Sequence, residues 1–145
     1  MHLRPAYLAL VFLGGTGGTL ARYGLGEVLP APAGLPLGIF LINVTGAFVL
    51  GLILEILARR GPDEGRRRAV RLLLGTGFLG GFTTYSALAV DSVLLLGAGR
   101  VIEGMSYVTV SVLTGLAATA AGIGTGSRIR RHPAAGPGVP TEVSP

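Results

Sequence analysis

The sequence predicts an all-α integral membrane protein with four transmembrane helices, the third of them broken. Half of the 145 residues are hydrophobic and only 13% are charged, which is too little charge to cover a soluble domain of this size. Four apolar stretches each reach the ~20 residues that cross ~30 Å of hydrocarbon, and none carries the polar stripe of a soluble amphipathic helix. The stretches cover residues 5–26, 36–57, 70–96 and 104–126.

The first stretch, 5–26, is predicted to be a retained helix rather than a cleaved signal peptide. Its apolar run passes without a small-residue cleavage pattern into Gly14-Gly-Thr-Gly-Gly and then Arg22-Tyr23. The glycines make one face nearly smooth, which favours close helix packing. Arg22 has two interpretations: it extends to the membrane interface, or it raises the local anion concentration at the mouth of a pore.

The second stretch, 36–57, carries Asn43 at its middle. A lone amide in hydrocarbon is costly unless it is hydrogen-bonded, and such residues are candidates for a functional site. Asn43 is therefore either a clamp between two helices or a donor to an anion through its NH2 group.

The third stretch, 70–96, contains the segment from Gly75 to Ser86, with four glycines and four Thr or Ser residues in twelve positions. Such a segment is tolerated at bilayer depth only where protein shields it or where it lines a polar cavity. Phe82 and Tyr85 are three residues apart, so we expect them near one helix face, where they either pack or present their positive ring edges to a small anion. Thr83, Thr84 and Ser86 form a hydroxyl cluster at the same place.

The fourth stretch, 104–126, places Tyr107, Ser111 and Thr114 at i, i+4 and i+7, on one helix face. A single hydroxyl often bonds its own helix, but three in register, together with the cluster of the third stretch, indicate a polar track. Gly122 and Gly126 form a small-xxx-small pair that predicts tight packing, and Gly115 extends the same small-residue pattern.

The arginines predict the orientation of the chain. Ten of the 12 lie before the first stretch, in the connection that runs from Arg59 to Arg71, or after the fourth stretch, and with four spans these regions share one side of the membrane. By the positive-inside rule both termini face the cytoplasm, and a secondary interpretation of the Arg66–Arg68 run is a patch for anionic lipid headgroups. We expect one membrane domain, 1–131, and a disordered Pro-, Gly- and Ala-rich tail, 132–145. Four such helices enclose little volume, so a pore would require a dimer.

Several classes of function are disfavoured by composition. The chain has no cysteine, and its two histidines, His2 and His132, lie near its ends, so no nucleophile–base pair of an enzyme is available. No acidic residue lies at the centre of a stretch, which argues against a proton-coupled small multidrug exporter. Asp91 and Glu55 are expected to be interfacial charges.

Three motifs carry a resemblance to a known family. They are Gly14-Gly-Thr-Gly-Gly-Thr-Leu-Ala-Arg22-Tyr23, Pro36-Leu-Gly-Ile-Phe-Leu-Ile-Asn43-Val-Thr-Gly-Ala-Phe48 and Gly77-Phe-Leu-Gly-Gly-Phe-Thr-Thr-Tyr-Ser86. In this order and spacing, over about residues 8–126, the chain resembles the CrcB/Fluc fluoride channels. The resemblance implies a multi-pass protein of the bacterial plasma membrane that works as an antiparallel dimer. It also implies that the protein is not an enzyme and that it exports fluoride passively from the cytoplasm, where hydrogen fluoride dissociates and the anion is trapped.

The resemblance also implies roles for individual residues. Asn43 would contact fluoride, Phe82 and Tyr85 would present their ring edges to it, and a polar track would be formed by Thr84, Ser86, Tyr107 and Ser111. A structural Na+ at the centre of the dimer would be held by the backbone carbonyls of Gly80 and Thr83, in keeping with the preference of hard cations for oxygen ligands.

The chain departs from the family pattern at three positions. The family usually has Phe where this chain has Tyr85 and Leu88, and Thr where it has Ile39. The alternative to a conducting channel is therefore a weakly conducting or non-conducting partner subunit of a heterodimeric fluoride channel, paired with an oppositely oriented homologue.

Overall fold

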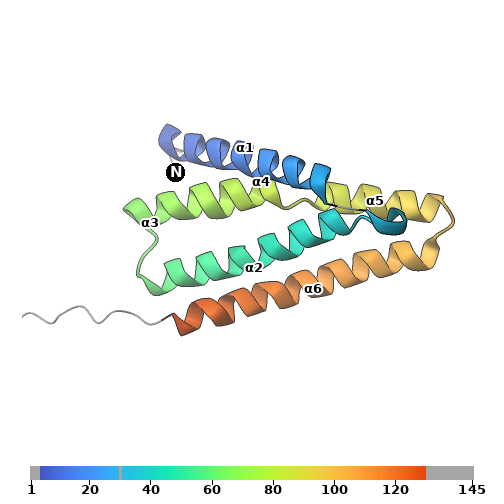
Figure 1. Cartoon of the computed structure of the whole chain (residues 1–145). Helices are drawn as coiled ribbons and strands as arrows, with labels where there is room; N and C mark the ends of the chain where they lie inside the picture. Colours follow the sequence, from blue (N-terminus) through green and yellow to red (C-terminus); the bar gives the residue numbers. More distant parts are fainter. Residues whose placement is uncertain (1–3, 30, 130–145) are drawn as a thin grey trace, which may run out of the picture.

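The computed structural model describes residues 4–29 and 31–129, and all regular elements in these ranges are helical. Three long helices are α1 (Pro5–Val28), α2 (Leu37–Arg59) and α6 (Val101–Arg128), and a short η1 (Pro32–Gly34) precedes α2. Between α2 and α6 the chain forms α3 (Gly65–Val70), η2 (Arg71–Leu79), α4 (Gly80–Phe82) and α5 (Tyr85–Gly97) in succession. The elements lie lengthwise beside one another, with α1 along α4 and α2 along α6 (Figure 1). The predicted tail, 132–145, lies outside the described residues.

Three helical segments within the described ranges are long and apolar enough to cross a membrane: Leu37–Arg59, Gly65–Gly97 and Val101–Arg128. They contain the predicted stretches 36–57, 70–96 and 104–126 almost completely and extend beyond most of their ends. The helix α1 also has 24 residues but does not reach the same hydropathy. The reason is its composition, since the Gly and Thr run from Gly14 to Thr19 adds little hydropathy and Arg22 subtracts from it.

Glycines bring α1 into backbone contact with η2 and α4. A methyl group added at Gly18 would overlap the carbonyl oxygen of Phe78, and one added at Gly81 would overlap that of Gly15. At Gly77 the added carbon would lie 2.9 Å from the carbonyl oxygen of Val11. No side chain fits at these three positions without separating the helices, so the glycines set the approach of α1 to the third apolar segment.

A second glycine contact joins α2 to α6. A Cβ at Gly51 would lie 2.5 Å from the carbonyl oxygen of Thr119, and one at Gly122 would overlap that of Phe48. Gly126 packs in the same way against Glu55 and Leu52, whereas Gly115 has open space around it. The small residues of α6 therefore pack tightly within the chain at Gly122 and Gly126, and Gly115 takes no part.

Buried apolar side chains form two small clusters. One contains Ile42, Leu79 and Phe82, and the other contains Leu88, Leu95 and Tyr107. Large apolar side chains elsewhere on α1, α5 and α6 point outward, which suits helices that face lipid or another protein chain.

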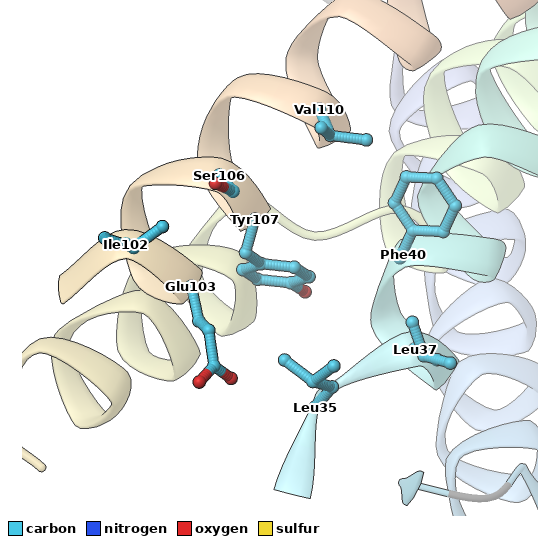
Figure 2. Close-up of a pocket in the computed structure, with 8 residues that line it drawn as sticks. All are labelled: Leu35, Leu37, Phe40, Ile102, Glu103, Ser106, Tyr107 and Val110. Carbon is cyan, nitrogen blue, oxygen red and sulfur yellow. The ribbon is translucent and has the colours of Figure 1, made fainter. Parts of the chain in front are cut away.

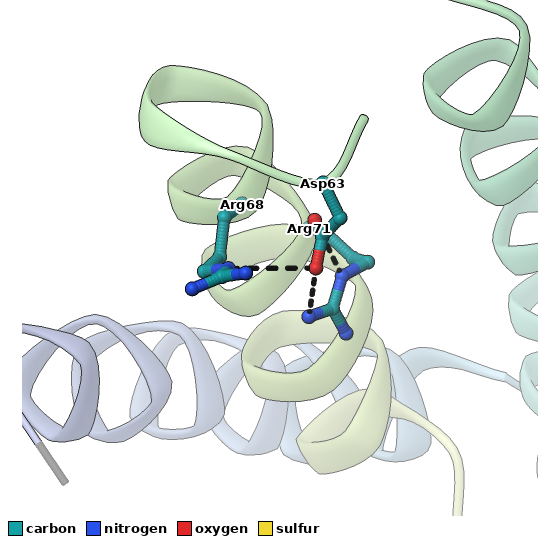
Figure 3. A network of polar contacts seen from close by, with 3 residues as sticks. All are labelled: Asp63, Arg68 and Arg71. Atoms are coloured by element: carbon teal, nitrogen blue, oxygen red, sulfur yellow. Dashed lines mark hydrogen bonds and ion pairs between the residues drawn. The ribbon is translucent and has the colours of Figure 1, made fainter. Parts of the chain in front are cut away.

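The arginine-rich connection between α2 and η2 is held by its own polar contacts. Asp63 accepts hydrogen bonds from Arg71, with Nε–Oδ1 and Nη2–Oδ2 distances of 3.0 Å and 2.7 Å, and Arg68 lies 3.6 Å away (Figure 3). The hydrogen bond from Arg71 holds the pKa of Asp63 below its ordinary value of 3.8. Arg67 donates to the carbonyl of Arg60 across Gly61, whose positive φ of 120° favours glycine. The connection is thus ordered while its surface stays cationic.

Candidate functional site

Helical structure stops at Phe82 and resumes at Tyr85. Between them Thr83 (φ −78°, ψ 154°) and Thr84 (φ −148°, ψ 124°) are extended. The preceding η2 is a π-helix of nine residues, a rare form often found at functional sites. The extended residues lie inside the segment from Gly75 to Ser86, for which the sequence predicts an interruption.

Asn43 joins α2 to this interruption through two hydrogen bonds with the backbone of Thr84. Its Nδ2 donates to the Thr84 carbonyl at 2.9 Å, and its Oδ1 accepts from the Thr84 N–H at 2.7 Å. The side-chain amide thus pairs with an extended residue as a neighbouring strand would. Since an Asn NH2 group has two N–H bonds, one remains for another acceptor.

The threonine side chains also bind the backbone. Thr84 Oγ1 accepts from the Ala87 N–H at 3.2 Å and lies 3.1 Å from Ser86 Oγ, so Thr84 caps the start of α5. Thr83 Oγ1 and the Thr83 N–H both donate to the Leu79 carbonyl, each at 2.9 Å. The bond to Thr84 Oγ1 pairs the Ala87 N–H, which the interruption would otherwise leave without a partner.

Arg22 reaches the interruption from α1. Its Nε donates to the Gly81 carbonyl at 3.2 Å, and Thr19 Oγ1 donates to the same oxygen at 3.4 Å. The half-buried Arg22 therefore contacts the interrupted helix through the Gly81 carbonyl. Thr19 was not among the candidates from sequence, because a hydroxyl among glycines gives no separate signal.

Two backbone carbonyls at the interruption lose their usual partners to side chains. In a continuous helix the Gly80 carbonyl would accept from the Thr84 N–H, and the Thr83 carbonyl from the Ala87 N–H. The first N–H donates to Asn43 and the second to Thr84 Oγ1. Within the described part of the chain no other group donates to these two carbonyls, and Gly80 is exposed with nothing packed over its Cα.

The two aromatic candidates lie in different surroundings, which corrects the expectation that they share one helix face. Phe82 is buried, stacks on Phe78 with ring centroids 5.9 Å apart, and packs with Ile42. Tyr85 is 81% exposed. The reason is the interruption between them, which changes the direction in which α5 presents its first side chain. Within one chain the two rings do not line a common surface.

The candidates on α6 face inward. Tyr107 is buried and its hydroxyl donates to the Pro36 carbonyl at 3.4 Å. It lines an apolar cavity of about 340 Å³ together with Phe40 of α2 and with Leu35, which precedes that helix (Figure 2). Ser111 is buried one turn further along, and the half-buried Thr114 follows it on the same face.

Two buried side-chain oxygens have no hydrogen-bond partner in the ranges that the structure covers: Ser111 Oγ and Asp91 Oδ2. Ser111 was a candidate from its spacing. Asp91 was expected to be an interfacial charge, and it lines a second cavity, of about 180 Å³, with Pro36 and Arg100. In the sequence, Asp91 is a carboxylate late in an apolar stretch. That position is equally compatible with the membrane interface and with a cavity inside the protein.

The fold and the site define a class: a multi-pass helical membrane protein whose polar groups gather at an interruption within an apolar helix. The chain matches the family described as "CrcB-like protein, Camphor Resistance (CrcB)" over residues 9–123. It belongs to this family.

Curated relatives cover most of the chain. It is 53% identical to "Fluoride-specific ion channel FluC 2" of Leifsonia xyli subsp. xyli over 129 residues, which is 89% of each chain. It is 50% identical to "Fluoride-specific ion channel FluC 1" of Cutibacterium acnes over 77% of this chain and 79% of that protein. It is 42% identical to "Fluoride-specific ion channel FluC" of Rhizobium etli over 79% of this chain and 90% of that protein. With its apolar helices, these likenesses make the chain a multi-pass protein of a bacterial membrane.

Proposed function

We propose that this protein is a fluoride-specific ion channel that lets fluoride leave the cytoplasm passively and so lowers its toxic level. The observation that carries the proposal is 53% identity, over 89% of both chains, to a protein named for that function. The chemistry of the site agrees with it. Hydroxyl and amide donors suit a small anion, and an anion bonded to such donors makes stronger hydrogen bonds than a neutral acceptor does.

The ion pathway is proposed to use the polar groups around the interruption and along α6. Asn43 keeps one N–H after binding Thr84, and Ser111 has a buried hydroxyl without a partner among the described residues. Arg22 adds positive charge beside Gly81. The remaining members are the hydroxyls of Thr84, Ser86 and Tyr107 and the ring edges of Phe82 and Tyr85.

The working unit is proposed to be an antiparallel dimer of four-span subunits. The helix α1 has 24 residues, about 36 Å at 1.5 Å per residue, which is enough to form the fourth span beside the interrupted one. Tyr85 is 81% exposed, and a partner subunit would cover it and bring it toward a Phe82 ring of the other chain. Both termini are proposed to face the cytoplasm, as the arginine distribution favours.

A structural Na+ is proposed at the centre of this dimer, held by the carbonyls of Gly80 and Thr83. The residues fit the ion because these two carbonyls accept no hydrogen bond within the described part of the chain and Gly80 is exposed. Backbone oxygens are suitable ligands for a hard cation. The ion would supply fixed positive charge between the two subunits.

The second candidate is a weakly conducting or non-conducting partner subunit, which Tyr85 and Ile39 suggest. The relatives favour the channel, since several are named as fluoride-specific ion channels. The two candidate functions differ in whether the chain conducts fluoride without a second, homologous subunit.

The experiment is efflux from liposomes that contain the purified protein. Vesicles loaded with potassium fluoride should release fluoride when a potassium ionophore balances the charge, and vesicles loaded with chloride should not. Equal rates for the two anions would refute selectivity. Release only after a homologous subunit is added would favour the partner-subunit alternative.

A further inference from the structure

The hydrogen bonds at the interruption point to a role for Asn43 that is separate from contact with an anion. Asn43 Oδ1 takes the N–H of Thr84 at 2.7 Å. That N–H is the one that would close a helical turn onto the Gly80 carbonyl. Asn43 thereby keeps the Gly80 carbonyl available to a ligand from outside the helix.

Thr84 does the same for the second carbonyl. Its Oγ1 takes the Ala87 N–H at 3.2 Å, and this N–H would otherwise bond the carbonyl of Thr83. Two carbonyls lie between these, and that of Gly81 is treated differently, because Arg22 and Thr19 both donate to it. Side chains thus bond the Gly81 carbonyl within the chain and take up the amides that would otherwise bond the carbonyls of Gly80 and Thr83.

We propose that Asn43 and the Thr84 hydroxyl are positioning residues of a Na+ site, which keep the Gly80 and Thr83 carbonyls available by binding the amides that would occupy them. The inference rests on the proposed function, because it assumes the cation site. It adds that a residue of the anion pathway also supports the cation site. Asn43 does not bond the proposed Na+-binding carbonyls itself; it acts on them through its hydrogen bonds to the backbone of Thr84.

Without Asn43 Oδ1, the Thr84 N–H is free to bond the Gly80 carbonyl and so competes with the cation. A positioning role therefore predicts weaker Na+ binding, whereas a merely structural role predicts lower stability at every Na+ concentration. The two are separated by the Na+ concentration that gives half of the stabilisation.

The test uses the full chain, purified in detergent, with helix content followed by circular dichroism during heating. NaCl replaces N-methylglucamine chloride at constant ionic strength. A ligand that binds only the folded state raises the unfolding midpoint as its concentration exceeds the dissociation constant. Asn43→Leu, which has a similar shape but no hydrogen-bonding group, should raise the half-saturating Na+ concentration about tenfold, which corresponds to about 1.4 kcal/mol.

A matched pair at Thr84 tests the second carbonyl independently and carries the test if Asn43→Leu does not fold. Thr84→Val removes the hydroxyl and should shift the Na+ response in the same direction, while Thr84→Ser keeps the hydroxyl and should restore it. Thr125→Val is the control, because the Thr125 hydroxyl bonds the Ala121 carbonyl at 2.8 Å within α6, far along the chain from the interruption.

The outcomes separate the two levels of the proposal. Wild-type protein that conducts fluoride but shows no Na+ response would remove the cation site, and this inference with it, while leaving the fluoride channel. A normal Na+ response in wild type and an unchanged half-saturating concentration in Asn43→Leu and Thr84→Val would overturn the inference alone. Equal loss of stability with and without Na+ would also overturn it, since that result assigns both side chains a purely structural role.

Discussion

At the scale of single residues, Asn43 determines the local chemistry of the interruption. The sequence indicates that a lone amide in an apolar helix needs a partner, and it leaves open whether the partner is another helix or an ion. The structure shows two bonds to Thr84, 41 residues away. No pattern in the sequence predicts that contact, because it depends on the extended conformation of Thr84 and on the rotation of α2 about its axis.

Replacement of Asn43 by Asp should block fluoride flux. The carboxylate has no donor for an anion, and two like charges 4 Å apart repel by about 4 kcal/mol at an effective dielectric constant of 20. We therefore expect at least a roughly 100-fold slower efflux from liposomes, with the helix content and oligomeric state of wild type. Thr125→Val should conduct normally. Wild-type flux in Asn43→Asp would restrict Asn43 to holding the backbone.

Phe82 and Tyr85 show that residue spacing alone does not predict which side chains lie on the same face of the molecule. Three residues apart, they would lie near one face of a continuous helix. The interruption between them buries Phe82 and exposes Tyr85. The sequence predicts an interruption in this segment, but the direction of the chain after it depends on two pairs of dihedral angles that composition does not determine.

At the scale of elements, glycine contacts hold the helices at backbone distance. Gly18 and Gly81 join α1 to the third apolar segment, and Gly51 and Gly122 join α2 to α6. The sequence predicts close packing from these small residues but not which helices meet, because every span is rich in glycine. The π-helix from Arg71 to Leu79 was also not predicted, since no local composition distinguishes it from an α-helix.

Gly18→Ala should destabilise the contact of α1 with η2 and α4, because the added methyl group would overlap the carbonyl oxygen of Phe78. Overpacking of this kind costs about 1–3 kcal/mol, so thermal unfolding in detergent should begin at a lower temperature. Gly24→Ala is the matched control in the same helix, since nothing lies within 4 Å of its added carbon in this chain. If both variants unfold like wild type, α1 does not pack as described.

At the scale of the whole molecule, charge distinguishes one end of the bundle from the other. Ten of the 12 arginines belong to the segments before α1, from the last residue of α2 to the first residue of η2, and from the end of α6 onward. The ordered Asp63 network offsets only part of this charge. Hydropathy alone predicts three of the four proposed spans clearly, and α1 needs the additional argument of its length and packing.

This arginine bias predicts that the chain inserts in one orientation. A tenfold preference needs only ~1.4 kcal/mol, and an excess of eight arginines should exceed it. When the chain is expressed alone, reporters fused to its C-terminus should give only a cytoplasmic signal. An antiparallel dimer would then need an oppositely oriented homologue. Comparable cytoplasmic and periplasmic signals from the lone chain, with full fluoride resistance of the cells, would instead support a homodimer of dual topology.

The central claim is passive conduction that is selective for fluoride, and the reversal potential of the current tests it most directly. In a planar bilayer with a tenfold fluoride gradient and equal chloride on both sides, the current through a fluoride-selective channel should reverse at a magnitude of about 59 mV. A pH difference across the bilayer should leave that value unchanged. A reversal potential near zero, or one that moves with the proton gradient, would contradict the account.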